Sequence, residues 1–233
     1  MTTAMEYDRA AEEYLLELPL EYFAQTTEQA YQHFVTNSSL GLLKAVRPDF
    51  QVFSELLVQY PISTKKKRTP ERVVPDNMVV IWPEPLTGLK AFHTPLQPVL
   101  PMMVMEYVSA SNRRKDYDDN FRRYRDDLHV PYYLLFEPEN QSLSVFHLED
   151  GKYVKIAKND AGRLAIPNLE LEVGLIDGWV RYWHRGVLLS LPGELLNQLR
   201  AKDDQLDAAR ERIREQAAEN ARLRDELAKL KAR

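Results

Sequence analysis

The C-terminal tract constrains the fold of this chain most strongly. After Pro192-Gly193, no further proline, glycine or aromatic residue occurs before the final Arg233. Proline and glycine are the strongest local breakers of regular structure, so an uninterrupted tract behind such a pair predicts one long helix. We therefore divide the chain into a body, residues 1–190, and a C-terminal coiled-coil helix, residues 191–233.

Residues in this tract recur at heptad spacing, which is typical of a coiled coil. Two sets of residues, which we call seams, each repeat every seven positions along one side of the helix. The first seam contains Leu199, Leu206, Ile213, Asn220 and Leu227. The second seam, offset by three positions, contains Leu195, Lys202, Ala209, Gln216, Leu223 and Leu230. Asn220 favours a parallel homodimer, because a buried asparagine in such a seam pairs with its copy and fixes the register. Glu219 and Arg224 have the spacing of an attractive pair between parallel partners. The alternative is a solvated single helix, which the polar Lys202 and Gln216 favour.

Composition excludes several classes of function. The 233 residues include no cysteine, which rules out a disulfide scaffold, a thiol nucleophile and cysteine-based zinc or iron–sulfur sites. A net charge of -4 gives no global attraction to nucleic acid, so any such binding needs local basic patches. The acidic N-terminal segment does not resemble a secretory signal, and no apolar run is long enough to span a bilayer. We expect a cytoplasmic protein without membrane contact.

The body alternates helical and strand-like patterns, which indicates an α/β fold. Helices are predicted from Thr26 to about Val35 and from Ser39 to Val46. Runs rich in β-branched and aromatic residues predict strands at 51–60, 77–82, 102–108, 132–136 and 142–147. The uninterrupted apolar run 132–136 suits a strand buried on both faces of a sheet. The charged segment 112–128 has apolar residues at helical spacing and predicts a strand–helix–strand crossover.

Two carboxylates stand among apolar neighbours. Asp76 lies at the start of the strand predicted at 77–82, and Glu106 lies inside the strand predicted at 102–108. A buried carboxylate is costly unless it is neutral, faces a cation or coordinates a metal. If the two strands pair, the carboxylates form an oxygen-rich site of the kind that Mg²⁺ prefers. The alternative is that Asp76 is a turn residue and that Glu106 faces solvent at the end of the sheet.

Four segments in order resemble a known family: Val74 to Asp76, Val104 to Ser109, Arg114 to Tyr124, and Val130 to Pro138. Over residues 20–185 the chain is similar to the Uma-two (Uma2) family of restriction endonucleases, within the PD-(D/E)XK nuclease superfamily. The resemblance implies a restriction-endonuclease-like fold, a mixed sheet flanked by helices. It implies that Asp76 and Glu106 bind a metal, Mg²⁺ or alternatively Mn²⁺, with the Tyr107 carbonyl as an extra ligand. The implied reaction is phosphodiester hydrolysis.

The sequence departs from the family pattern at the catalytic lysine. The superfamily position two residues after Glu106 is Val108, which carries no charge, and the helix position that commonly substitutes is Asn120. Asparagine can hold a water or a phosphate oxygen but stabilises negative charge more weakly than lysine. We rank Lys115 first as a replacement because it lies near the helix start, with Arg122 or Arg123 as alternatives. The alternative for all three is a solvated helix face, which the ordinary alternation of charges on a helix surface favours.

Other candidate residues give weaker indications of function. Four adjacent cations, Lys65 to Arg68, suit either phosphate contact or a plain exposed loop. The five histidines have no ligand spacing, so neither a histidine metal site nor a serine–histidine relay is indicated. Phe121 and Tyr124 recur on the apolar stripe of the predicted helix, and we expect them in the core.

Three functions remain open. The leading one is a metal-dependent DNA endonuclease that is dimeric through its C-terminal helix. The second is a catalytically weakened nuclease fold that acts as a nucleic-acid-binding or assembly module, which Val108 and Asn120 favour. The third is a dimeric scaffold that does not bind nucleic acid, which the net negative charge permits.

Overall fold

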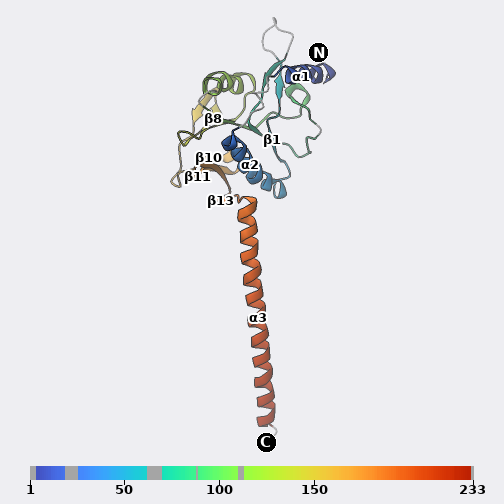
Figure 1. Ribbon diagram of the computed structural model, residues 1–233, viewed down its shortest axis with the longest axis vertical. Helices are drawn as coiled ribbons and strands as arrows, with labels where there is room; N and C mark the ends of the chain where they lie inside the picture. The colour runs from blue at the N-terminus through green and yellow to red at the C-terminus, as the bar shows by residue number, and fades with distance from the viewer. Residues whose placement is uncertain (1–3, 19–25, 62–69, 88, 110–112, 232–233) are drawn as a thin grey trace. The chain divides into compact units, whose positions relative to one another are not determined.

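The computed structural model describes residues 4–18, 26–61, 70–87, 89–109 and 113–231 (Figure 1). The chain divides into two compact units, residues 1–189 and 190–233. None of the helices in the described ranges has the length and apolar character needed to cross a membrane. The basic run Lys65 to Arg68 lies outside the described residues, so its prediction stays open.

A mixed six-stranded sheet forms the centre of the first unit, which confirms the predicted α/β class. Its strand order is β1-β4-β6-β7-β8-β9. The bounds are β1 Phe50–Ser54, β4 Asn77–Ile81, β6 Met103–Tyr107, β7 Tyr132–Glu137, β8 Ser142–Glu149 and β9 Lys152–Lys155. All neighbours are antiparallel except β6 and β7, which are parallel. Every residue of β7 is buried, as its uninterrupted apolar run predicts.

A helical segment, residues 113–127, connects the parallel strands β6 and β7, and we call it the crossover helix. It contains two π-helical stretches, η4 (Lys115–Asn120) and η5 (Arg123–Asp127). Backbone bonding from residue i to i+5 widens these turns, so residues four apart stay close to one face of the helix. Asp116, Asn120 and Tyr124 follow this spacing and are all buried. The crossover therefore turns two polar residues and one tyrosine toward the sheet.

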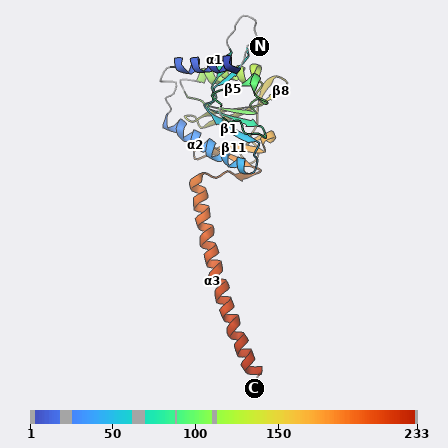
Figure 2. The same cartoon turned by 90° about the vertical axis from the view of Figure 1, so that its right-hand side faces the viewer.

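A second layer covers the opposite face of the sheet (Figure 2). It consists of α2 (Thr27–Gly41), the 3-10 turn η2 (Leu42–Ala45) and an antiparallel sheet in the order β10-β11-β12-β13. The strands are β10 Leu164–Ile166, β11 Leu171–Ile176, β12 Trp179–His184 and β13 Val187–Leu188, with the 3-10 turn η6 at Pro167–Leu169. The Gln32 amide donates to the Val180 carbonyl at 3.3 Å, which ties α2 to β12. Thr26 caps α2 through a capping box with Gln29.

A small third sheet in the order β3-β2-β5 and helix α1 complete this unit. The bounds are α1 Ala4–Glu17, β2 Val58–Tyr60, β3 Glu71–Val73, β5 Phe92–His93 and the 3-10 turn η3 Thr94–Leu96. Two predictions about local structure are wrong, and one helix was missed. The run 51–60 is two strands, because Glu55 adopts a positive φ of 51° and its amide bonds to the Asp76 carbonyl. The helix starting at Thr27 continues to Gly41, and α1 was not predicted at all.

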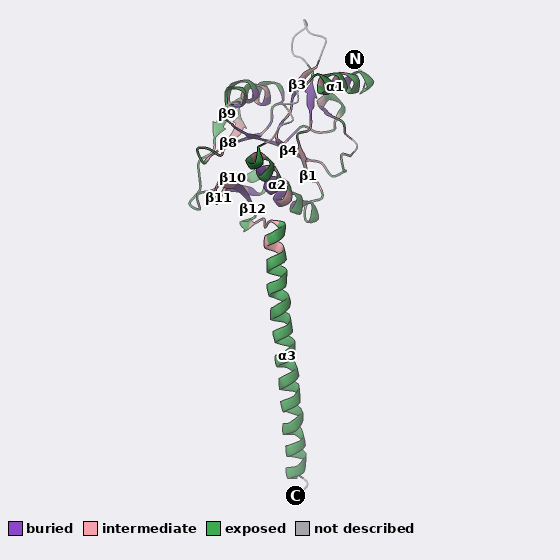
Figure 3. Ribbon diagram, viewed as in Figure 1, coloured by how far each residue is buried: buried purple, intermediate pink, exposed green. Residues whose placement is uncertain are grey.

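The second unit is one helix, α3 (Pro192–Lys231), as its composition predicts. It has no buried residue, and Figure 3 shows it exposed along nearly all of its length, apart from half-buried residues in its first turn. Both seams therefore face solvent in the single chain: Leu206, Ile213 and Leu227 are 54%, 64% and 54% exposed. Charge pairs within the helix join Arg210 to Asp207 and Arg214 to Glu211.

Candidate functional site

The two predicted carboxylates lie side by side. Strands β4 and β6 are antiparallel with Asn77 opposite Met105, so one further step places Asp76 opposite Glu106. The Tyr107 amide donates a hydrogen bond to Asp76 Oδ2, which fixes this carboxylate against the end of β6. The pairing of the two strands, on which the expected site depends, is thus confirmed.

Glu106 points toward the crossover helix. Its neighbours Met105 and Tyr107 belong to the core on the α2 side, so strand alternation turns Glu106 to the other face, where it is 2% exposed. The Tyr124 hydroxyl donates to Glu106 Oε1 at 2.6 Å, and Asn120 Nδ2 donates to the same oxygen at 3.1 Å. Glu106 is therefore held by side chains from a segment of the chain that only the crossover brings near it.

Asp116 adds a third carboxylate close to this pair. Asn120 Nδ2 also donates to Asp116 Oδ1 at 3.0 Å, and the Tyr133 hydroxyl donates to the Asp116 carbonyl at 2.9 Å. Asp116 and Asn120 are completely buried. We call Asp76, Glu106, Asp116, Asn120 and Tyr124 the carboxylate cluster.

Burial raises the pKa values of all three carboxyl groups. For Glu106, loss of solvent raises the pKa well above its usual value, and repulsion from Asp76 and Asp116 adds to the rise. Loss of solvent also raises the pKa of Asp116 to about 7 and is the main cause of the raised pKa of Asp76. The Asp76 side chain is 25% exposed, so it is the member of the pair that solvent reaches. Unless a cation binds, the cluster therefore carries fewer negative charges than three ionised carboxylates would.

The cluster contains oxygen acceptors of the kind that a hard divalent cation selects. Asp116 Oδ2 and Asn120 Oδ1 are buried acceptors for which no hydrogen-bond partner exists in the part of the chain that the structure describes. Buried acceptors without partners are rare, and their oxygen chemistry is what Mg²⁺ selects. No group of three His, Asp or Glu side chains close enough to hold a metal occurs among the described residues. The ligands that the family resemblance implies, Asp76, Glu106 and the Tyr107 carbonyl, would need water to complete the shell of Mg²⁺, which usually keeps several waters.

The structure distinguishes the candidate cations. Lys115 is exposed at the start of the crossover helix, and its charge lowers the pKa values of Asp76, Glu106 and Asp116 against the dominant effect of burial. Arg123 instead donates to the Arg72 carbonyl at 3.4 Å. Val108 is buried in the core. Of the predicted cations, Lys115 is the one that acts electrostatically on the carboxylate pair.

Sequence reasoning missed three members of this neighbourhood. Tyr124 is in the core as predicted, but its hydroxyl also bonds to Glu106. Asp116 lies in the segment 112–128, which the sequence marks only as charged, although the spacing of four from Asp116 to Asn120 to Tyr124 is visible there. His33 from α2 lies with Nε2 4.0 Å from Asp76 Oδ1, a contact that no spacing along the chain reveals. Asn120 was expected to hold a water or a phosphate oxygen, whereas its amide nitrogen bonds to two carboxylates.

Replacement of Tyr124 by phenylalanine tests whether the cluster is held as described. We expect Tyr124→Phe to lower the free energy of unfolding by about 2 kcal/mol, because a buried carboxyl oxygen loses a donor. Tyr153→Phe is the matched control: its hydroxyl donates to the neutral Val130 carbonyl at 2.9 Å, and its loss should cost about 1 kcal/mol. Urea unfolding at neutral pH measures both. Equal losses for the two variants would contradict a special role for the Tyr124 hydroxyl.

Comparison with known proteins assigns the chain to a family. The model of the Uma2 family, described as "Putative restriction endonuclease", matches residues 21–178, which is more than half of the chain. The chain belongs to the Uma2 family. The matched region contains the whole carboxylate cluster, and the resemblance stated from the sequence is confirmed.

The Uma2 chain is also similar to a solved structure. That protein, from Anabaena variabilis ATCC 29413, is described as "a putative nuclease belonging to DUF820". The two chains share 19% identity, with 62% of this chain and 74% of the other covered and a TM-score of 0.44. The comparison with curated proteins gave no match.

Proposed function

We propose that this Uma2 protein is a divalent-metal-dependent DNA endonuclease. The observation that carries the proposal is the placement of Asp76 and Glu106 on adjacent strands, in a cluster where burial makes their negative charge costly. Membership of a family described as restriction endonucleases supports the same conclusion. Mg²⁺, or Mn²⁺ in its place, would be held by the two carboxylates and the Tyr107 carbonyl.

Each residue has a distinct role in the proposed reaction. A metal held at this position would polarise the scissile phosphate and make a bound water more acidic. Asp76 and Glu106 fix its place, and Asn120 and Tyr124 keep Glu106 in one orientation through their hydrogen bonds. Lys115 stands in for the missing strand lysine and stabilises negative charge that develops on the phosphate.

Cations next to the cluster provide the attraction for DNA that the net charge of the chain does not. Arg113, Arg114 and Lys115 are consecutive and exposed at the start of the crossover helix. Adjacent exposed cations suit contact with a phosphate backbone. We infer that a DNA strand passes along this helix start and brings a phosphate to the carboxylate pair. Dimerisation through α3 would give the protein two such sites for the two strands of a duplex.

A cleavage assay with controlled metal content tests the proposal. Supercoiled plasmid and single-stranded DNA are incubated with the full-length protein in Mg²⁺, in Mn²⁺ and in EDTA. We expect nicks or breaks with either metal, at least a hundredfold slower cleavage in EDTA, and recovery when metal is restored. DNA binding without cleavage under all conditions would instead support the second function, a weakened nuclease fold that binds nucleic acid, which Val108 and Asn120 favour.

A further inference from the structure

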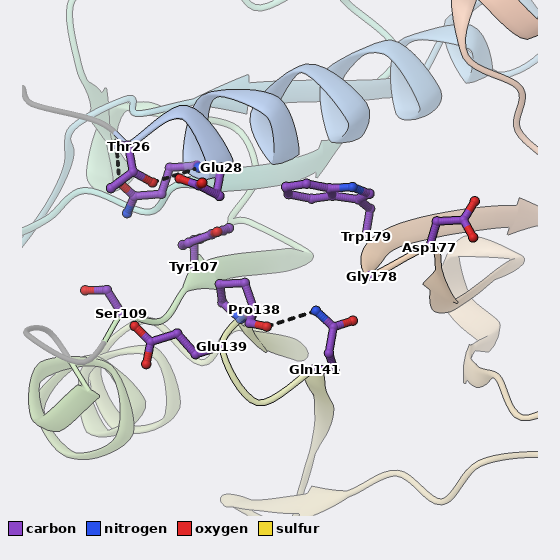
Figure 4. Close-up of a pocket in the computed structure, with 11 residues that line it drawn as sticks. Thr26, Glu28, Tyr107, Ser109, Pro138, Glu139, Gln141, Asp177, Gly178 and Trp179 are labelled. Carbon is purple, nitrogen blue, oxygen red and sulfur yellow. Dashed lines mark hydrogen bonds between the residues drawn. The ribbon is translucent and has the colours of Figure 1, made fainter.

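A cavity opens at the end of β6, on the α2 side of the sheet. It has a volume of about 430 Å³ and is bounded by α2, the end of β6, the β7–β8 turn and the β11–β12 turn. Tyr107, which follows Glu106 and whose amide bonds to Asp76, forms part of its wall. Figure 4 shows Glu28, Tyr107, Pro138 and Trp179 around this space. The cavity and the proposed site of cleavage therefore adjoin the same strand end, the C-terminal end of β6.

Two aromatic side chains in the wall are braced by other rings. Tyr31 contacts Trp179 edge-on with the ring centroids 4.6 Å apart, and Phe136 contacts Tyr107 in the same way at 5.6 Å. Ring pairs of this geometry are favourable and keep each wall residue in place. The half-buried Trp179 therefore offers the cavity a flat apolar surface that does not have to be ordered when a planar ligand enters, whereas Tyr107, at 3% exposed, contributes little open surface.

The charged residues of the wall are all acidic. Glu28, Glu139 and Asp177 line the cavity, and no lysine or arginine is among the lining residues that the structure describes. Hydrogen bonds from its own backbone amide and from the Thr27 hydroxyl lower the pKa of Glu28, so it is ionised at neutral pH. A phosphate would be repelled from such a wall, whereas a planar group that carries N–H donors would be attracted.

The amide of Gln141 adds to this acceptor-rich character. Its Nε2 already donates to the Pro138 carbonyl at 2.9 Å, which leaves Oε1 as an acceptor. A Cβ at Gly178 would lie 2.9 Å from this oxygen, so the absence of a side chain there lets the Gln141 amide pack against the β11–β12 turn. The acceptors therefore come from three separate segments of the chain.

The exposed cations lie close to the same wall. Arg113 contacts Glu137 with its guanidinium nitrogen 3.5 Å from the carboxylate, and Glu137 directly precedes the wall residues Pro138 and Glu139. A strand whose phosphates lie along Arg113 to Lys115 would pass the mouth of the cavity. Phosphates would stay outside with the cations, and a base could enter the cavity beside Trp179.

We propose that this cavity receives an unpaired or extruded nucleobase that carries an exocyclic amino group. Proteins that take a base out of its stack hold it between aromatic side chains and read its edge by hydrogen bonds. Carboxylate and amide oxygens accept from the amino groups of cytosine and adenine, whereas thymine offers no such donor. The inference rests on the proposed function, because it makes the cavity the specificity pocket of the same site.

Binding of homopolymeric single strands in EDTA tests the pocket without cleavage. Dye-labelled dC20 and dT20 are titrated with the full-length protein at low salt, and fluorescence anisotropy gives the dissociation constants. We expect about tenfold tighter binding of dC20 than of dT20. Trp179→Ala should weaken binding of both strands about tenfold, whereas Trp179→Phe, which keeps a stacking surface, should restore it. Glu139→Gln should reduce the preference for dC20.

Glu149→Gln is the matched control, because Glu149 is exposed on β8, pairs with His147 and does not line the cavity. Glu139 is exposed too, so neither glutamine variant should unfold the protein. Equal binding of the two strands by the unchanged protein, or no binding of either, overturns the inference. So does a Glu139→Gln variant that behaves like Glu149→Gln. Cleavage with metal but without base preference would refute the pocket alone, and base preference without cleavage would refute the nuclease alone.

Discussion

We expect Asp76→Asn to reduce DNA cleavage about a thousandfold in the presence of Mg²⁺ or Mn²⁺. Asp76 is the partly exposed member of the carboxylate pair, and asparagine is a far poorer ligand for a hard cation than a carboxylate. A thousandfold corresponds to about 4 kcal/mol of lost transition-state stabilisation, within the several kcal/mol that a catalytic metal supplies. Initial rates of plasmid nicking, compared with those of the unchanged protein, measure the loss.

The same variant should be no less stable than the unchanged protein. The asparagine oxygen can still accept from the Tyr107 amide, and loss of the Asp76 charge removes one of the charges that repel Glu106. Thermal unfolding without metal should show an unchanged or higher midpoint. Asp160→Asn is the control, since Asp160 is an exposed carboxylate in a turn far along the chain, and it should cleave normally. Normal cleavage by Asp76→Asn would refute the assigned site.

We expect the full chain to be a dimer in solution that dissociates when charge is placed in the α3 seam. The double variant Leu206→Asp with Ile213→Asp should raise the dissociation constant at least a hundredfold. In the dimer, the two aspartates would bury unpaired charge at two layers of the coiled coil where the unchanged protein has apolar side chains. Analytical ultracentrifugation over a range of protein concentrations measures the change in molar mass.

A control with the same charge outside the seams separates dimerisation from helix propensity. Ala208→Asp introduces aspartate at an exposed position of α3 that belongs to neither seam, and the dimer should persist. A full chain that stays monomeric at high micromolar concentration would favour the alternative of a solvated single helix. Cleavage by a monomeric variant would show that the carboxylate cluster is sufficient without the partner.

Local patterns in the sequence predicted much of the framework. The apolar runs at 77–82, 102–108 and 132–136 became β4, β6 and β7, because side-chain alternation and burial are legible from neighbouring residues. The prediction of a single strand at 51–60 failed, because the backbone conformation of one residue decided the outcome there. Nothing in the composition of 51–60 showed that Glu55 would take a left-handed conformation and send the chain into a second sheet.

The sequence by itself determined the long helix of α3, the crossover between parallel strands and the presence of two carboxylates among apolar residues. These follow from heptad spacing, strand periodicity and the cost of buried charge, all of which act between near neighbours. Only the tertiary structure decided that Tyr124 and Asn120 hold Glu106, that Asp116 joins them, and that a cavity opens beside Tyr107. Those contacts join segments far apart in the chain, and they depend on strand register and on the width of the π-helical turns, which no local pattern specifies.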